Sequence, residues 1–235
     1  MIAKIFLICS ILPFIKAFSF NENDLAKLGQ DRFCFFAYST RTKVSTIQQI
    51  YPNAERVGVA RLPYHRLDFN YYLEEVKGSI PTIVPDCGYE VWGAIYTIPI
   101  NDLELVLSKG TMAGNQRVFG FVQKIIETYS NGNLIYLKCN AFQQIDLPEK
   151  FIYGLPFPKE RRPSRGTLDR MIDAYTDAGL PKKYIQEISM IPTTDNNLGS
   201  LPHTPIVVAP DSLVVAPGST VVAQNKDASK NDDDD

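Results

Sequence analysis

The sequence predicts a mixed α+β domain, and three segments carry this prediction. Residues Tyr89–Ile98 (YEVWGAIYTI) are aromatic and β-branched almost without interruption, which is typical of a buried strand. Residues Phe119–Glu127 and Leu134–Cys139 read as two strands joined at an Asn-Gly turn, a strong signal for a hairpin. Further along, apolar residues recur at helical spacing: Leu168, Met171, Ile172 and Tyr175. Strands therefore come first and helices flank them.

The N-terminal half of the domain should begin with a strand at Cys34–Tyr38. A short helix follows, with Ser45 as the expected N-cap and Gln48 completing a capping box, and Pro52 ends it. Beyond this helix we expect two short strands separated by Pro63: Val57–Leu62 and Arg66–Phe69.

Two later helices have recognisable ends. Asn101 is the expected N-cap of the first, with Glu104 at its third position and Gly110 as the glycine after its last turn. The second should begin at a cap on Ser164 or Thr167. Gly179 should end it, and Pro181 should open one more helix.

The two ends of the chain differ in composition from its middle. Residues 1–19 combine a lysine, an apolar run of eleven residues and a small-residue cleavage point, the layout of a secretory signal peptide. From residue 191 onward, three seven-residue units (TPIVVAP, DSLVVAP, GSTVVAQ) precede four C-terminal aspartates, and their prolines exclude a helix. We expect a signal peptide (1–19), a domain (20–190) and a flexible low-complexity tail (191–235) in a secreted, extracellular protein.

Charge and cysteine content limit the classes of partner. Loss of the two lysines of the signal would take the net charge from −2 to −4, and the domain itself is near neutral, so no nucleic-acid partner is expected. Cys34, Cys87 and Cys139 remain, and the sequence leaves all three pairings open. With only His65 and His203 and no zinc-like cysteine spacing, neither a metal nor another cofactor is expected. The apolar run is too short for a membrane span.

Four segments in order resemble the γ-glutamylcyclotransferase family. They are FAY before a turn, VARLPYHRLDF (Val59–Phe69), EVWGAIYTI (Glu90–Ile98) and PSRGTLDRMIDAYTDAGLPKKY (Pro163–Tyr184). The resemblance spans residues 32–188. The resemblance implies a small closed or nearly closed mixed β-barrel with helices on its outside. It also implies an activity, because the enzymes of this family release 5-oxoproline from γ-glutamyl amino acids without a cofactor. It also implies a small γ-glutamyl or amino-acid-like ligand.

The resemblance assigns the family's chemistry to few positions. The α-amine of the substrate attacks its own γ-carbonyl, so the protein must move protons and hold an oxyanion. In the family a Glu moves the protons, a Tyr-Gly-Ser-Asn turn binds the γ-glutamyl end, and two tyrosines line the cavity. The corresponding turn lies in FFAYSTRT: Tyr38 matches, whereas Ser39, Thr40 and Arg41 replace the glycine, serine and asparagine.

The remaining family positions also differ. Lys109 stands where the catalytic Glu is expected, and no acid occurs between Leu105 and Thr111. Gln116 and Thr167 stand where the cavity tyrosines are expected. Loss of a general base alone typically costs about 100- to 10,000-fold in rate.

Three hypotheses remain open at this stage. The first is a secreted protein of this fold with impaired or no activity, acting as a binding or structural module. The second is an active γ-glutamylcyclotransferase with a rearranged site, in which Lys109, Glu90 or Asp68 supplies the base. The third is anion binding by a basic cluster: Lys159, Arg161, Arg162, Arg165 and Arg170.

Overall fold

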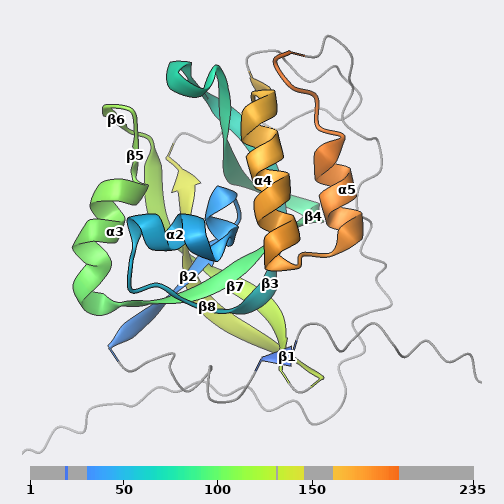
Figure 1. The fold of residues 1–235 in the computed structure, drawn as a ribbon. Coiled ribbons are helices and arrows are strands. Elements are labelled where there is room, and N and C mark those ends of the chain that lie inside the picture. The colour runs from blue at the N-terminus through green and yellow to red at the C-terminus, as the bar shows by residue number, and fades with distance from the viewer. Residues whose placement is uncertain (1–18, 21–30, 131, 146–160, 196–235) are drawn as a thin grey trace, which may run out of the picture.

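Five strands pair side by side in a ring in the computed structural model, which describes residues 19–20, 31–130, 132–145 and 161–195 (Figure 1). The order is β7-β3-β4-β2-β8, and β8 pairs with β7 again. The strands are β2 (Arg32–Ala37), β3 (Glu55–Leu73), β4 (Gly78–Pro99), β7 (Phe119–Ser130) and β8 (Asn133–Gln144). A short β1 (Ser19–Phe20) adds to β7 in parallel.

The ring contains two long antiparallel hairpins, and it is joined elsewhere by two short strand pairings, which we call seams. β3–β4 and β7–β8 pair antiparallel along their lengths. By contrast, β3 meets β7 through the single pair Arg61–Glu127, and β2 meets β8 in parallel through Phe35–Asn140. The sheet is therefore mixed and nearly closed, which confirms the predicted class and architecture.

The inside of the ring is filled by apolar side chains from all five strands, with Phe36, Ile95 and Ile126 fully buried. One disulfide joins Cys34 on β2 to Cys139 on β8, across the parallel seam. Cys87 is a free, exposed thiol. The structure thus selects one of the three pairings that the sequence left open.

In the described part of the chain, four α-helices pack on the outside of the ring in two pairs (Figure 1). α2 (Val44–Ile50) and α3 (Leu103–Gly110) border one core that contains Phe35, Tyr96 and Phe142. α4 (Arg165–Ala178) and α5 (Lys182–Ser189) cover a second core around Phe69. Side chains alternate along β2, so that its odd residues face the first core and its even residues face the ring interior.

The strand predictions need two corrections. The segments on either side of Pro63 are one strand, β3, in which the register shifts between Pro63 and His65 and Tyr64 takes a φ of 57°. Tyr89–Ile98 is only the second half of β4, which begins at Gly78. The Asn-Gly hairpin is confirmed, since Ser130 pairs with Asn133 across a two-residue connection and Gly132 has a φ of 81°.

The predicted helix ends are partly wrong. Ser45 lies inside α2, whose N-cap is Lys43, and Asn101 lies in a 3₁₀ turn, η4 (Ile100–Asp102), that precedes α3. Gly110 is the last residue of α3 and not a left-handed cap. Ser164 does cap α4, accepting a hydrogen bond from the Thr167 N–H at 3.3 Å, and Gly179 ends this helix at φ 71°.

Some expectations concern residues outside the described ranges. Residues 1–18 and 196–235 include nearly all of the expected signal peptide and the three repeats. Among the described residues, no helix has both the length and the apolar character to cross a bilayer.

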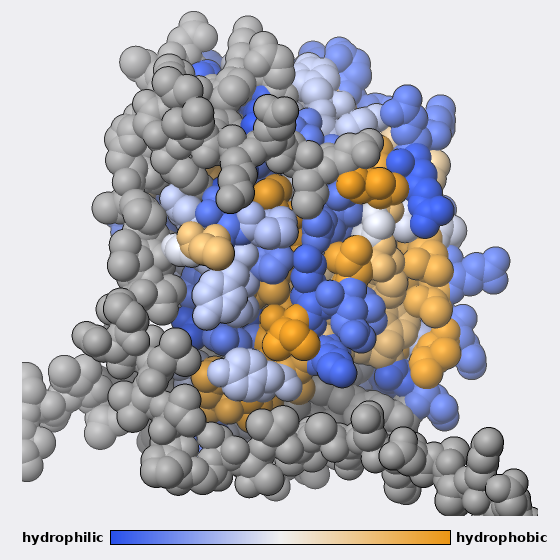
Figure 2. Space-filling model, turned by 180° about the vertical axis from the view of Figure 1, so that it is seen from behind, coloured by the Kyte–Doolittle hydropathy of each residue, from blue (hydrophilic) through white to orange (hydrophobic). Residues whose placement is uncertain are grey.

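The β7–β8 hairpin exposes four large apolar side chains: Ile125, Tyr129, Leu134 and Tyr136. Their cross-strand neighbours include Glu127 and Lys138, so charge interrupts the apolar surface. Seen from behind, the coloured surface of the molecule shows hydrophobic patches interspersed with hydrophilic ones (Figure 2).

Candidate functional site

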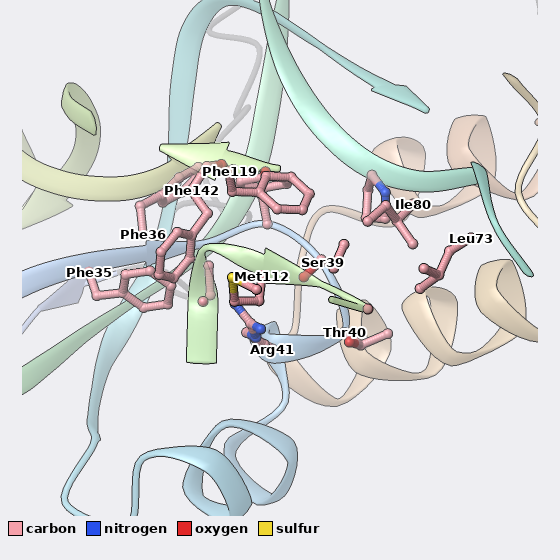
Figure 3. Close-up of a pocket in the computed structure, with 16 residues that line it drawn as sticks. Phe35, Phe36, Ser39, Thr40, Arg41, Leu73, Ile80, Met112, Phe119 and Phe142 are labelled. Atoms are coloured by element: carbon pink, nitrogen blue, oxygen red, sulfur yellow. Dashed lines mark hydrogen bonds between the residues drawn. The ribbon is translucent and has the colours of Figure 1, made fainter. Parts of the chain in front are cut away.

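A pocket of about 280 Å³ opens where β2 turns into η2 (Thr40–Thr42). Its walls come from the end of β2, from the β3–β4 hairpin, from the end of α3 with the following β5 (Met112–Ala113), and from β7 and β8. Figure 3 shows phenylalanine side chains grouped on one side and Leu73 and Ile80 on the other, with Arg41 and Met112 between them. The pocket is therefore apolar at both ends and carries a cation near its middle.

The turn that follows β2 places three consecutive residues in the pocket wall. Ser39 is still extended, and its carbonyl accepts hydrogen bonds from the Thr42 N–H at 3.0 Å and from Thr42 Oγ1 at 2.9 Å. This closes the 3₁₀ turn, so that Ser39, Thr40 and Arg41 all line the pocket. The Tyr96 hydroxyl donates to the Thr42 carbonyl at 2.7 Å and ties the turn to β4.

A glycine on β4 allows the turn to sit where it does. A Cβ on Gly93 would lie 2.3 Å from the Ala37 carbonyl oxygen, at the last residue of β2. Only a residue without a side chain lets β4 approach the strand end this closely. Gly93 thus positions the start of the turn from the neighbouring strand.

Tyr38 fixes the turn to the rest of the molecule from within the core. Its hydroxyl donates to the Phe142 carbonyl, and its own carbonyl accepts from the Tyr175 hydroxyl on α4. Burial raises the pKa of Tyr38 far above its usual value, and the positive charge of Arg41 only partly opposes this shift. Tyr38 is therefore a neutral phenol with a structural role, unsuited to proton transfer near neutral pH.

Arg41 is held by aromatic rings. Its guanidinium carbon lies 5.4 Å from the ring centroid of Phe142 and 6.0 Å from that of Tyr51, both within the range of a cation–π contact. Within the described part of the chain, this guanidinium has no ion pair and no hydrogen bond. Its donors are consequently available to a ligand.

The residue at the expected catalytic position does not line the pocket. Lys109 is exposed on α3, whereas the next residue, Gly110, is buried and forms part of the wall. A Cβ on Gly110 would fall 1.8 Å from the ring of Phe142. The helix end therefore contributes packing to the pocket, and the lysine side chain lies elsewhere.

Two further expected site residues also lie outside the lining. Gln116, on β6 (Gln116–Arg117), is exposed, and its Oε1 accepts from the Tyr71 hydroxyl at 2.9 Å. Thr167 is buried in the first turn of α4, where its Oγ1 is 3.0 Å from Ser164 Oγ. The structure thus brings Tyr38 and the three residues after it together and leaves Lys109, Gln116 and Thr167 apart.

None of the described residues that line the pocket is an Asp or a Glu. Glu75, in η3 (Glu74–Val76), comes to its rim: its Oε1 lies 3.5 Å from the point where a Cβ on Gly114 would be. Gly114 itself lines the pocket. Glu75 is exposed, so it remains in contact with water.

The two acids considered as alternative bases are engaged in ion pairs. Asp68 is 1% exposed and accepts from Arg66 and Arg161 at 2.7 Å each, while its other oxygen accepts from the Phe69 N–H. Glu90 accepts from Arg61 at 2.9 Å and from the Trp92 indole at 2.7 Å. Both carboxylates are therefore occupied by donors from the protein, and neither is among the residues that line the pocket.

The basic cluster is divided among separate contacts. Arg161 pairs with Asp68, and Arg165 pairs with Asp169 at 2.9 Å. Arg170 donates to Thr167, and the Arg162 carbonyl accepts from the Ser79 N–H. Lys159 lies outside the described residues. Two members of the cluster, Arg161 and Arg165, are therefore already paired with carboxylates of the protein.

The sequence indicated the turn but missed most of the wall. Four lining residues come from four separate strands: Leu73 from β3, Ile80 from β4, Met112 from β5 and Phe142 from β8. In the sequence each reads as an ordinary core residue. The only signal of proximity was the alternation within the strands, which does not say which strands meet.

Solved structures of other proteins share this fold, although no protein-family model and no curated protein matches the sequence. A human protein described as uncharacterized aligns over 72% of this chain and 94% of its own, with a TM-score of 0.58 and 22% identity. A γ-glutamyl cyclotransferase aligns over 72% and 92%, with a TM-score of 0.56 and 22% identity.

A third structure, YkqA from Bacillus subtilis, aligns over 73% of this chain and 60% of its own, with a TM-score of 0.50 and 15% identity. Sequence identities this low carry information about the backbone and not about the site. The chain has the fold of the γ-glutamyl cyclotransferases.

Proposed function

We propose that this protein is a binding module built on the cyclotransferase fold, with little or no cyclotransferase activity. The observation that carries the proposal is the composition of the pocket: Arg41 lies within it, and no carboxylate is among its described lining residues. Fold alone does not determine activity, whereas the groups at the site do.

The missing carboxylate matters because of the reaction. Cyclisation of a γ-glutamyl group requires that the substrate ammonium lose a proton before it attacks. A guanidinium beside that ammonium repels it, and no acid in the described pocket wall is available to accept the proton. Removal of a general base typically lowers the rate by about 100- to 10,000-fold.

Secretion is part of the proposal. The layout of residues 1–19 is that of a signal peptide. The Cys34–Cys139 disulfide supports it, because such bonds persist mainly in oxidising compartments. Detection of the chain in the medium of secreting cells, cleaved near residue 19, is the expected result, and retention of an uncleaved chain inside the cells would contradict it.

The activity is tested by incubating the folded protein with a γ-glutamyl amino acid and measuring 5-oxoproline. We expect no release above a heat-inactivated control. A thermal unfolding curve on the same preparation establishes that the protein is folded. Enzymatic turnover in this assay would refute the proposal directly.

The alternative is an active cyclotransferase with a rearranged site, and one observation favours it. Glu75 lies at the rim beside Gly114, where a small movement of η3 would bring a carboxylate to the pocket. If 5-oxoproline is released, the variant Glu75→Gln should lose the activity and the neighbouring Glu74→Gln should keep it. Lys109→Ala serves as the corresponding test of the lysine.

A further inference from the structure

We infer that the pocket binds a small apolar monocarboxylate, anchored by Arg41. The inference rests on the proposed binding function and specifies its ligand. A γ-glutamyl group differs from this ligand because it carries an ammonium and is polar along its length. The residues that surround the turn favour an apolar acid over such a polar group.

The anchor is the guanidinium of Arg41. The two aromatic rings beneath it fix its position without using its N–H donors, since a cation–π contact involves the face of the ring. A planar guanidinium presents paired N–H groups that match the two oxygens of a carboxylate. Because Arg41 has no ion pair within the described chain, a ligand carboxylate could pair with its guanidinium without displacing a protein partner.

The remainder of the wall sets the character of the ligand body. Apart from the turn, the lining consists of aliphatic, aromatic and glycine residues, among them Leu73, Ile80, Met112 and Phe119. Burying apolar ligand surface against such a wall is favourable by roughly 25 cal/mol per Å². Figure 3 shows phenylalanines on one side of Arg41 and aliphatic side chains on the other, so either an aromatic or an aliphatic body finds a matching surface.

The same wall argues against zwitterions. One guanidinium balances one negative charge, and the described lining offers no acid to balance an ammonium. A volume of about 280 Å³ lies just below the range of roughly 300–1,000 Å³ that holds drug-sized ligands. The pocket is therefore suited to a small acid with a single charge.

The test compares acids with their neutral amides. We would titrate the full chain calorimetrically with phenylacetate and hexanoate, and then with phenylacetamide and hexanamide, which keep the shape and lose the charge. The acids should bind and the amides should bind at least tenfold more weakly. γ-Glutamyl-alanine should bind more weakly than either acid.

The variant Arg41→Gln should weaken binding of phenylacetate by about 10- to 100-fold, as expected when a charge-assisted hydrogen bond is removed. The affinity of Arg41→Lys for phenylacetate should lie between those of Arg41→Gln and the unmodified chain, because lysine keeps the charge and loses the paired donors. Arg117→Gln is the matched control, since Arg117 is exposed on β6 and lies outside the pocket lining. It should bind as the unmodified chain does.

Equal binding of acid and amide, or unchanged binding in Arg41→Gln, would overturn the ligand class while leaving a binding module in place. Failure of all four probes to bind would also overturn it. Release of 5-oxoproline would instead refute the proposed function and is measured separately. The comparison of acid with amide uses the unmodified chain, so it remains decisive even if the Arg41 variants do not fold.

Discussion

Two buried tyrosines contact the turn, and they differ in whether their hydroxyl group has a hydrogen-bond partner. Tyr96 donates its hydroxyl to the Thr42 carbonyl at 2.7 Å. Tyr51 is equally buried, yet within the described chain its hydroxyl has no hydrogen-bond partner. Burial raises the pKa of both groups, so both remain neutral phenols. The contrast makes them a matched pair in which the same substitution has opposite consequences.

We expect Tyr96→Phe to lower the free energy of unfolding by about 1–3 kcal/mol, because it leaves a buried carbonyl unsatisfied. Tyr51→Phe removes a group that lacks a partner and should leave stability unchanged or raise it by up to about 1 kcal/mol. Urea denaturation of both variants measures the difference. A loss in Tyr51→Phe as large as that in Tyr96→Phe would show that the Tyr51 hydroxyl has a partner after all.

Sequence reasoning at this scale reached the turn but not its surroundings. The resemblance identified Ser39, Thr40 and Arg41 as departures, and all three line the pocket. It did not indicate that Phe142 and Tyr51 would hold the guanidinium. Phe142 lies on a strand about 100 residues further along the chain and Tyr51 directly follows α2, so no local sequence pattern connects them with Arg41.

Among the elements, β3 departs most from its prediction. Proline lacks an N–H and normally ends a ladder, which is why the sequence suggested two strands around Pro63. The structure keeps one strand by a register shift, with Tyr64 in the left-handed region. The irregularity turns His65 toward Lys124 on β7, whose Nζ lies 3.1 Å from His65 Nε2.

This pair gives the protein a predictable response to pH. Burial lowers the pKa of His65 below its ordinary 6.5, the hydrogen bond to the Pro63 carbonyl opposes this, and the charge of Lys124 lowers the pKa further. Below about pH 6.5 the unfolded chain therefore binds more protons at this site than the folded chain, and stability falls as the pH falls.

The measurement is the free energy of unfolding at pH 7.5 and pH 5.5. The loss between these values should be smaller in His65→Gln than in the unmodified chain. His203→Gln removes the only other histidine and is the control, which should retain the full loss. An identical pH dependence in all three proteins would contradict the assigned shift.

At the scale of the whole molecule, closure of the ring is the feature that sequence patterns alone could not supply. Periodicity identified strands and the β7–β8 hairpin, but the seams β3–β7 and β2–β8 join segments about 65 and 105 residues apart. In each seam, the strand pairing consists of one described residue pair. The near-closed barrel was implied only by the resemblance, because its four segments carry information on how distant parts pack together.

The parallel seam also contains the disulfide, which leads to a prediction about the whole fold. Cys34 and Cys139 enclose a sequence separation of 105 residues, and cross-links of this length restrict the unfolded chain by about 4.7 kcal/mol in the chain-entropy model. Replacing both by alanine should lower the free energy of unfolding by about 2–5 kcal/mol, the usual effect of losing such a bond. Cys87→Ala should change it by no more than about 0.5 kcal/mol, since Cys87 is exposed and unbridged.

Reduction with dithiothreitol separates the loss of the bond from the loss of side-chain volume. It should lower the urea midpoint of the unmodified chain and of Cys87→Ala, and it should have no effect on the double variant. A midpoint that does not respond to reduction in the unmodified chain would mean that the seam is held by packing and strand pairing without help from the disulfide.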